Sequence, residues 1–180
     1  MSICLARADA ATRRDSNVID FQTEHQLRES SVSTATTQHE SLEAELELRR
    51  TLNSVPDELF EDGVENELSR AIPRLVARFG AAAVEAIARL YLGRMVPRDI
   101  MSEVLRWLGR VEDEATCEAR FWFLIYCLRD DSPAVRSAAA LGLASLEDVR
   151  AVPYLRREAG AESIGLLRCR LEKVANELGA

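Results

Sequence analysis

The sequence predicts an all-α protein whose antiparallel helical hairpins stack into an α-solenoid. Ala and Leu are abundant, and aromatic residues make up only 6% of the chain, a composition typical of helices that pack through small and medium side chains. Several segments space their apolar residues three and four positions apart, as one face of a helix requires. Two of these segments also resemble each other, which favours a repeated unit.

The chain divides into a flexible leader, residues 1–39, and a helical repeat domain, residues 40–180. The leader lacks sustained periodicity, and its polar stretch Ser30–Gln38 is rich in side chains that compete with helical hydrogen bonds. The pattern becomes helical at Glu40. The first predicted helix carries a modest apolar stripe of three leucines: Leu42, Leu46 and Leu52.

The next predicted helix has a strong amphipathic pattern. Its apolar residues run from Leu68 to Phe79 and stop at Gly80, a residue typical of helix C-termini. Pro73 lies inside this run and favours a helix start at Ile72, because proline is best tolerated in the first turn.

Further helices are predicted after Gly80. The segment 121–128 is apolar nearly all round, as expected for a central helix that its neighbours cover, and a strand is the alternative for these residues. The last predicted helix has polar residues on one side and is interpreted as a terminal cap. The other predicted helices are 84–92, 100–108, an Ala-rich helix ending at Leu146, 149–158 and 164–178.

Two segments of the chain share a pattern. Residues 70–75 (RAIPRL) are similar to residues 150–155 (RAVPYL), and a Gly-Ala pair follows each of them. The similarity predicts equivalent helices in a stack. Strict alternation of the hairpin helices would instead make one a first helix and the other a second helix, so the register of the repeat stays open.

The sharpest local pattern lies in residues 128–159. An acidic residue, Ser and Pro precede an Ala-rich helix, as expected where side chains cap a helix N-terminus and small residues let helices approach closely. The pattern resembles a HEAT repeat in its short bacterial form. The residues that carry the resemblance are Asp131, Pro133, Val135, Arg136 and Pro153.

The resemblance implies a role for these residues and for the chain. In HEAT repeats the Asp and the Arg of the pattern often pair between neighbouring repeats, so Asp131 and Arg136 are expected to be structural. HEAT-like stacks mostly hold other macromolecules, which implies a non-catalytic scaffold, adaptor or regulator that binds a protein partner. The alternatives are a HEAT protein that binds DNA or repairs its bases, and an enzyme accessory of the chromophore-lyase type.

The residue content argues against several classes of enzyme and against a cofactor or metal site. Both histidines, His25 and His39, lie in the leader, so the helical domain lacks an imidazole for nucleophilic or metal chemistry. The four cysteines show no CxxC spacing. The acidic run from Glu112 to Glu118 is interpreted as a solvated turn and a helix N-terminus. We therefore expect no catalysis, no cofactor and no bound metal.

The charge favours a protein partner over a nucleic acid. The net charge is −7 and the pI is about 5.0, which disfavours broad neutralisation of phosphates. We expect a monomer or a weak oligomer. The candidate partner-binding surface is a group of arginines: Arg150, Arg156, Arg157 and Arg168.

The apolar runs in the sequence are short. None reaches the roughly 18 uncharged residues that a membrane-spanning helix needs, and the apolar run near the N-terminus ends in charges after a few residues. We therefore expect no membrane contact and a cytoplasmic location.

Overall fold

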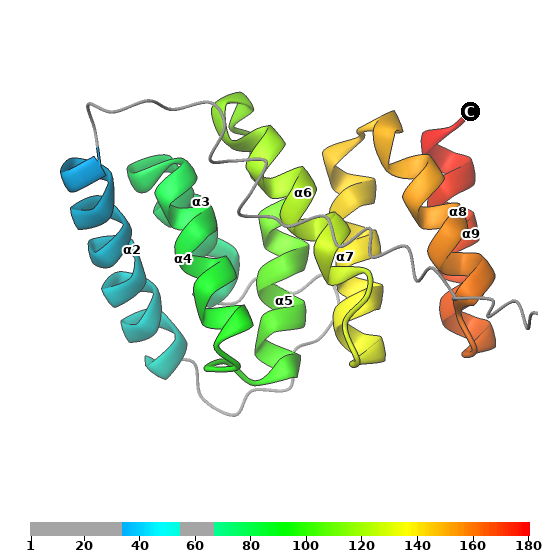
Figure 1. Ribbon diagram of the computed structural model, residues 1–180, viewed down its shortest axis with the longest axis horizontal. Helices are drawn as coiled ribbons and strands as arrows, with labels where there is room; N and C mark the ends of the chain where they lie inside the picture. Colours follow the sequence, from blue (N-terminus) through cyan, green and yellow to red (C-terminus); the bar gives the residue numbers. More distant parts are fainter. Residues whose placement is uncertain (1–33, 55–66) are drawn as a thin grey trace, which may run out of the picture. The chain divides into compact units, whose positions relative to one another are not determined.

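Regular structure is entirely helical in residues 34–54 and 67–180, which the computed structural model describes (Figure 1). The predicted all-α class is thus confirmed for these residues, and the strand alternative for 121–128 is wrong. Two short 3-10 turns, η1 (Glu114–Thr116) and η2 (Val149–Ala151), precede α6 and α8. The α-helices are α2 (Thr34–Ser54), α3 (Glu67–Phe79), α4 (Ala81–Leu92), α5 (Arg98–Gly109), α6 (Cys117–Cys127), α7 (Pro133–Leu146), α8 (Val152–Ala161) and α9 (Gly165–Leu178).

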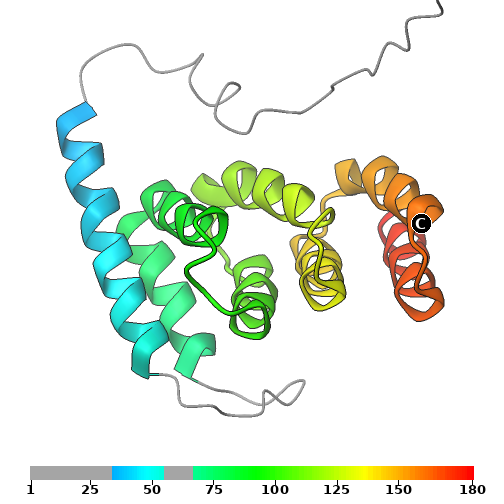
Figure 2. The same cartoon turned by 60° about the horizontal axis from the view of Figure 1, so that its bottom comes forward.

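Helices that are two apart in the chain lie side by side. α3 packs against α5, α5 against α7 and α7 against α9. Figure 2 shows α5, α7 and α9 next to one another. In the same way α2 packs against α4, and α4 against α6. Tyr154 of α8 contacts the rings of Phe121 and Trp122 on α6. We therefore distinguish an odd row, α3, α5, α7 and α9, from an even row, α2, α4, α6 and α8.

The two rows separate the segments that are similar in sequence. Residues 70–75 belong to α3 in the odd row, whereas residues 150–155 belong to η2 and to α8 in the even row. The segments do not occupy equivalent positions, so their similarity does not mark the repeat.

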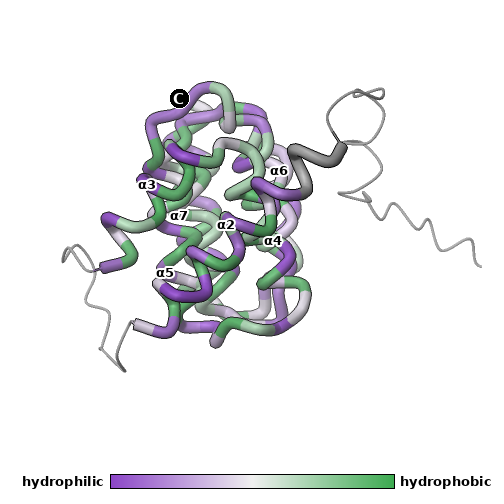
Figure 3. Tube along the Cα trace, turned by 90° about the vertical axis from the view of Figure 1, so that its left-hand side faces the viewer, coloured by the Kyte–Doolittle hydropathy of each residue, from purple (hydrophilic) through white to green (hydrophobic). Residues whose placement is uncertain are grey.

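Hydrophobic and hydrophilic residues are mixed along the helices (Figure 3). The segment 121–128, in α6 and just after it, is largely covered by neighbouring helices. α6 packs against α4, α5 and α7, and Phe121, Phe123 and Leu124 are at most 1% exposed. The prediction of a covered helix in this segment is confirmed, with Tyr126 as an exposed exception. None of the described helices is both long enough and apolar enough to cross a membrane.

The packing of α5 against α7 is close because glycines meet there. A Cβ atom on Gly109 would lie 2.6 Å from the carbonyl carbon of Gly142 and nearer still to its Cα and oxygen. A Cβ atom on Gly142 would lie 2.8 Å from the carbonyl oxygen of Leu105. Backbone therefore packs on backbone, an approach that only the smallest residues allow.

The leucine stripe predicted for α2 is not its buried side. Leu42 and Leu46 are 58% and 48% exposed, whereas Ala44 and Leu48 are buried. The side of α2 that packs against α3 and α4 therefore carries Ala44 and Leu48, and not Leu42 and Leu46 of the predicted stripe.

Polar contacts with α4 explain how α2 is turned. Arg89 donates to the carbonyl oxygen of Ser41 at 3.1 Å and to the carboxylate of Glu45 at 3.2 Å. These contacts hold the side of α2 that carries Ser41 and Glu45 against α4. Leu48 lies on the same side, one turn further on, and is buried as a result.

Some helix boundaries differ from the sequence prediction. α3 begins at Glu67 and contains Pro73, so the predicted start at Ile72 is wrong; the buried side chains on either side of the proline keep the segment helical despite the lost hydrogen bond. Gly80 ends α3 as predicted, with a positive φ of 55°. α2 begins at Thr34, so the end of the predicted leader is helical, and residues 1–33 lie outside the described residues.

Two leucine substitutions test the orientation of α2. We expect Leu48→Ala to lower the free energy of unfolding by about 2–4 kcal/mol, because it leaves a cavity beneath a side chain that is 2% exposed. Leu42→Ala removes the same atoms from an exposed side chain and should change the stability by less than about 0.5 kcal/mol. Urea denaturation measures both values, and a larger loss for Leu42→Ala would contradict this orientation.

Candidate functional site

Two of the predicted arginines lie against aromatic rings where α6 meets α8. The guanidinium of Arg150 is 4.6 Å from the centre of the Phe121 ring, and that of Arg157 is 5.5 Å from the centre of the Tyr154 ring. The two rings contact each other edge to face at 6.5 Å. Arg150 and Arg157 therefore border one continuous group of aromatic side chains.

The other two arginines lie elsewhere. Arg156 reaches the end of α9, where its Nη2 is 3.7 Å from the position that a Cβ on Gly179 would take. Arg168 is exposed on the second turn of α9 and has no ion pair with any described residue. The structure thus does not join the four arginines into one patch.

Arg150 is neutralised by two carboxylates. Its Nη2 is 2.7 Å from the carboxylate of Asp148 and 2.8 Å from that of Glu118. Hydrogen bonds from the guanidinium lower the pKa of both carboxyl groups, and the same bonds, first that to Asp148, raise the pKa of Arg150. All three groups therefore stay charged and paired near neutral pH.

A second group of paired charges lies further along α8. Glu158 accepts from Arg129 and from Arg157, each at 2.9 Å. The arginines that border the aromatic rings are thus balanced by neighbouring carboxylates. This surface is close to neutral and does not present the free positive charge that the arginines in the sequence indicate.

Large apolar side chains are exposed on α4, on α6 and in the turn after α4. Leu92 and Met95, at the end of α4, are 49% and 59% exposed, and Tyr126 of α6 is 43% exposed. Trp122 is half-buried and contacts Tyr154 edge to face at 5.9 Å. We name these five residues, which come from α4, α6 and α8 and the turn after α4, the aromatic surface.

Tyr126 links the aromatic surface to α4. Tyr126 contacts the buried ring of Tyr91 at 6.2 Å, and Leu92 follows Tyr91 in α4. The aromatic residues are visible in the sequence, but their partial exposure is not. Exposure depends on which side chains of neighbouring helices cover each ring, and helical periodicity gives no information about those neighbours.

The acidic residue of the HEAT-like pattern differs from the one that packs in the structure. Asp131 is 93% exposed at its side chain and lies 3.8 Å from Arg94. Its neighbour Asp130 is 4% exposed and pairs with Arg98 of α5 at 3.0 Å. The buried position thus falls one residue before the position that the resemblance indicates, because the turn after α6 directs Asp130 inward.

Asp130 joins four segments of the chain. Besides Arg98, its carboxylate accepts hydrogen bonds from the Tyr91 hydroxyl of α4 and, at 2.7 Å, from the backbone N–H of Ser132 at the start of α7. Ser132 makes no capping bond with its own side chain. Asp130 therefore makes the structural ion pair that the resemblance assigns to Asp131, and it accepts the hydrogen bond at the start of α7 that the sequence assigns to a capping side chain.

The remaining residues of the pattern lie in helix starts and in the core. Pro133 is the first residue of α7 and Pro153 the second of α8, positions where a missing N–H removes no helical bond. Val135 is fully buried. Arg136 bonds to the carboxylate of Glu162, before α9, at 2.8 and 3.0 Å, and it also donates to the Asp130 carbonyl oxygen at 2.8 Å.

The Arg136–Glu162 pair predicts a dependence of stability on pH. Arg136 lowers the pKa of the Glu162 carboxyl below its ordinary value of 4.5. A carboxyl whose pKa is lower in the folded than in the unfolded chain stabilises the fold above the unfolded pKa, and this contribution is lost as the pH falls through the folded value. We expect Glu162→Gln to be less stable than the wild type at pH 7, with a difference that shrinks below pH 4.5.

Denaturation of both proteins between pH 3 and pH 7 measures this difference. Glu112→Gln, at an exposed carboxylate, serves as the control and should follow the wild type throughout. A constant difference between Glu162→Gln and the wild type across this range would contradict the assigned role.

The buried thiol and phenol are unsuited to nucleophilic chemistry. Burial raises the pKa of Cys127 and of Tyr91, and the Tyr91 hydroxyl donates a hydrogen bond to the Asp130 carboxylate. Both groups therefore stay protonated near neutral pH. In residues 34–54 and 67–180 no group of three His, Cys, Asp or Glu side chains is arranged to hold a metal ion.

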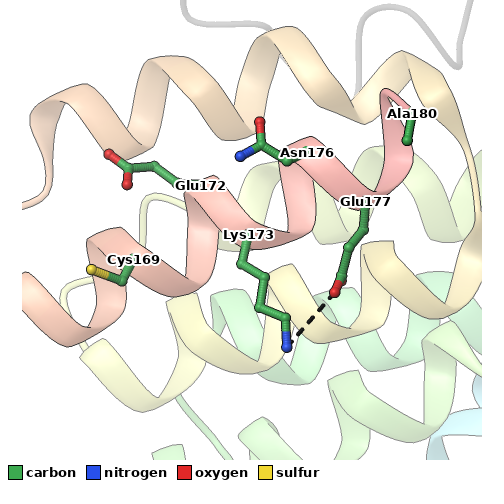
Figure 4. Close-up of a pocket in the computed structure, with 6 residues that line it drawn as sticks. All are labelled: Cys169, Glu172, Lys173, Asn176, Glu177 and Ala180. Carbon is green, nitrogen blue, oxygen red and sulfur yellow. Dashed lines mark ion pairs between the residues drawn. The ribbon is translucent and has the colours of Figure 1, made fainter.

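A surface hollow lies on the outer side of α9 (Figure 4). Its volume is about 520 Å³, and Cys169 is one of its exposed side chains. Lys173 and Glu177 pair with each other at 3.7 Å. The lining residues are Cys169, Glu172, Lys173, Asn176, Glu177 and Ala180.

The chain matches no protein-family model, no curated protein and no solved structure.

Proposed function

We propose that this chain is a HEAT-like α-solenoid that acts as a non-catalytic scaffold and binds a protein partner through the aromatic surface. The observation that carries the proposal is the exposure of Leu92, Met95 and Tyr126, large apolar side chains in the last turn of α4, in the turn after it and near the end of α6. Exposed large apolar and aromatic side chains are typical of protein interfaces.

The packing of helices two apart in the chain supports the solenoid part of the proposal. The described hairpins contact one another through the odd row and, in the even row, through α2–α4, α4–α6 and the ring contacts of Tyr154 with α6. Stacked repeats bury their apolar sides in this way. The Arg136–Glu162 and Arg98–Asp130 pairs link consecutive helices of the odd row, as expected for a repeated contact.

The chemistry of the aromatic surface favours a protein over a nucleic acid. Trp, Tyr and Arg are the residues that most often contribute binding energy at protein interfaces. The arginines here are already paired with Glu118, Asp148 and Glu158, so little positive charge remains for phosphates.

The experiment compares the full-length wild type with the double variant Leu92→Ser, Tyr126→Ser. Each protein is immobilised and incubated with extract of its native cells, and the captured partner is purified for affinity measurements. We expect the double variant to bind that partner at least about thirtyfold more weakly, because it removes two apolar anchors.

Leu46→Ser is the matched control, because Leu46 lies on α2, outside the aromatic surface, and is nearly as exposed as Leu92. It should bind like the wild type. Equal affinity of the double variant and the wild type would refute the aromatic surface as the binding site, and capture of nucleic acid that is released by salt would refute a protein partner.

A further inference from the structure

α7 and α9 begin with the same arrangement of side chains. Asp130 accepts from the backbone N–H of Ser132 at 2.7 Å, and Glu162 accepts from that of Ile164 at 3.0 Å. An arginine follows each carboxylate by six residues, Arg136 in α7 and Arg168 in α9. The buried residues also correspond at equal spacing: Val135 with Leu167, Ala139 with Leu171, and Leu143 with Ala175.

The arginine of α7 holds the helix that packs next to it. Arg136 bonds to Glu162, which precedes α9, at 2.8 and 3.0 Å. On the same side of α7, Ser137 accepts a hydrogen bond from Arg170 of α9. This side of α7 is therefore the surface against which α9 docks.

The corresponding side of α9 is open in the described structure. Arg168 occupies the position of Arg136, is exposed, and forms no ion pair with any described residue. Cys169 corresponds to Ser137 and lines the hollow of about 520 Å³ together with Glu172 and Asn176 (Figure 4). Leu166, in the first turn, is 89% exposed.

We propose that the outer side of α9 docks a helix of a partner protein that presents a carboxylate to Arg168 from its N-terminal end. The Arg136–Glu162 contact supplies the geometry, since Arg168 stands where Arg136 meets its carboxylate. The exposed carboxylate of Glu172, one turn further on, has no ion pair with a described residue and fits a Lys or Arg one turn along the partner helix.

This docking site is separate from the aromatic surface, and its test gives a separate result. A displayed library of helical peptides of about 18 residues, randomised on one side, is selected on immobilised full-length protein. We expect the selected peptides to carry Asp or Glu in the first turn and a basic residue one turn later. Their affinity should not change in the Leu92→Ser, Tyr126→Ser variant.

Charge reversal identifies the contact. Arg168→Glu should weaken binding of a selected peptide at least about tenfold, and replacing the first-turn acid of that peptide by Lys should restore binding to this variant. Arg74→Glu, at an exposed arginine of α3, should leave binding unchanged. Circular dichroism confirms that each variant is folded.

Three outcomes of the peptide experiments would overturn the proposal. They are selected peptides without a first-turn acid, equal binding to the wild type and Arg168→Glu, and absence of rescue by the reversed peptide. Sedimentation of the protein alone tests a second copy as the occupant: self-association that Arg168→Glu abolishes would assign the site to the chain itself and would contradict a separate partner.

Discussion

Replacing Gly109 by alanine is expected to lower the free energy of unfolding by about 3 kcal/mol or more. The new Cβ would lie 2.6 Å from the carbonyl carbon of Gly142 and closer to two other backbone atoms of that residue. Backbone atoms cannot rotate away as a side chain can, so α5 and α7 must separate and both helices lose buried contacts. Urea denaturation measures the loss.

Gly160→Ala is the matched control for this substitution. Gly160 lies in α8, and a Cβ there would meet no heavy atom within 4 Å. Alanine has the higher helix propensity, so the control should be unchanged or more stable by up to about 1 kcal/mol. Equal effects of the two substitutions would contradict the close packing of α5 on α7.

Replacing Asp130 by alanine is expected to destabilise the protein by about 2–4 kcal/mol. The substitution removes the carboxylate that pairs with Arg98 and accepts from Tyr91 and from the backbone of Ser132. The Tyr91 hydroxyl then remains buried without this acceptor, and Arg98 loses its charge partner. Arg98 is one-third exposed, so water reduces the loss from that side of the pair.

Asp131→Ala, at the adjacent residue, is the control. Asp131 carries the same charge but is 93% exposed, so its removal should change the stability by less than about 0.5 kcal/mol. Thermal and urea denaturation of both variants test the assignment. A larger effect at Asp131 would favour the residue that the HEAT-like pattern indicates over the one that the structure buries.

The sequence predicted the helices better than their orientation. The stripes in α3, α5 and α9 have strong periodicity, and their apolar residues are mostly buried. In α2 the stripe is weak, and contacts of Arg89 with Ser41 and Glu45, far away in the chain, turned Leu42 outward. Local periodicity contains no information about such distant polar contacts.

The sequence predicted only some of the residues of the candidate sites. The arginines were visible, but the carboxylates that neutralise Arg150 come from α6 and from the turn before η2, and only folding brings them together. A different signal was present: Asp130 and Glu162 each precede an arginine by six residues. That spacing relates α7 to α9, whereas the similarity of residues 70–75 and 150–155 relates helices of different rows.

Helices two apart in the chain lie side by side, and the α5–α7 contact tests this arrangement most directly. The measurement is the nuclear Overhauser effect between the α-protons of Gly109 and Gly142, with both residues assigned. We expect a strong cross-peak, because the two backbones are in contact. Assigned signals without a cross-peak would show that α5 and α7 do not pack in this way, and would contradict the stack and the docking surfaces inferred from it.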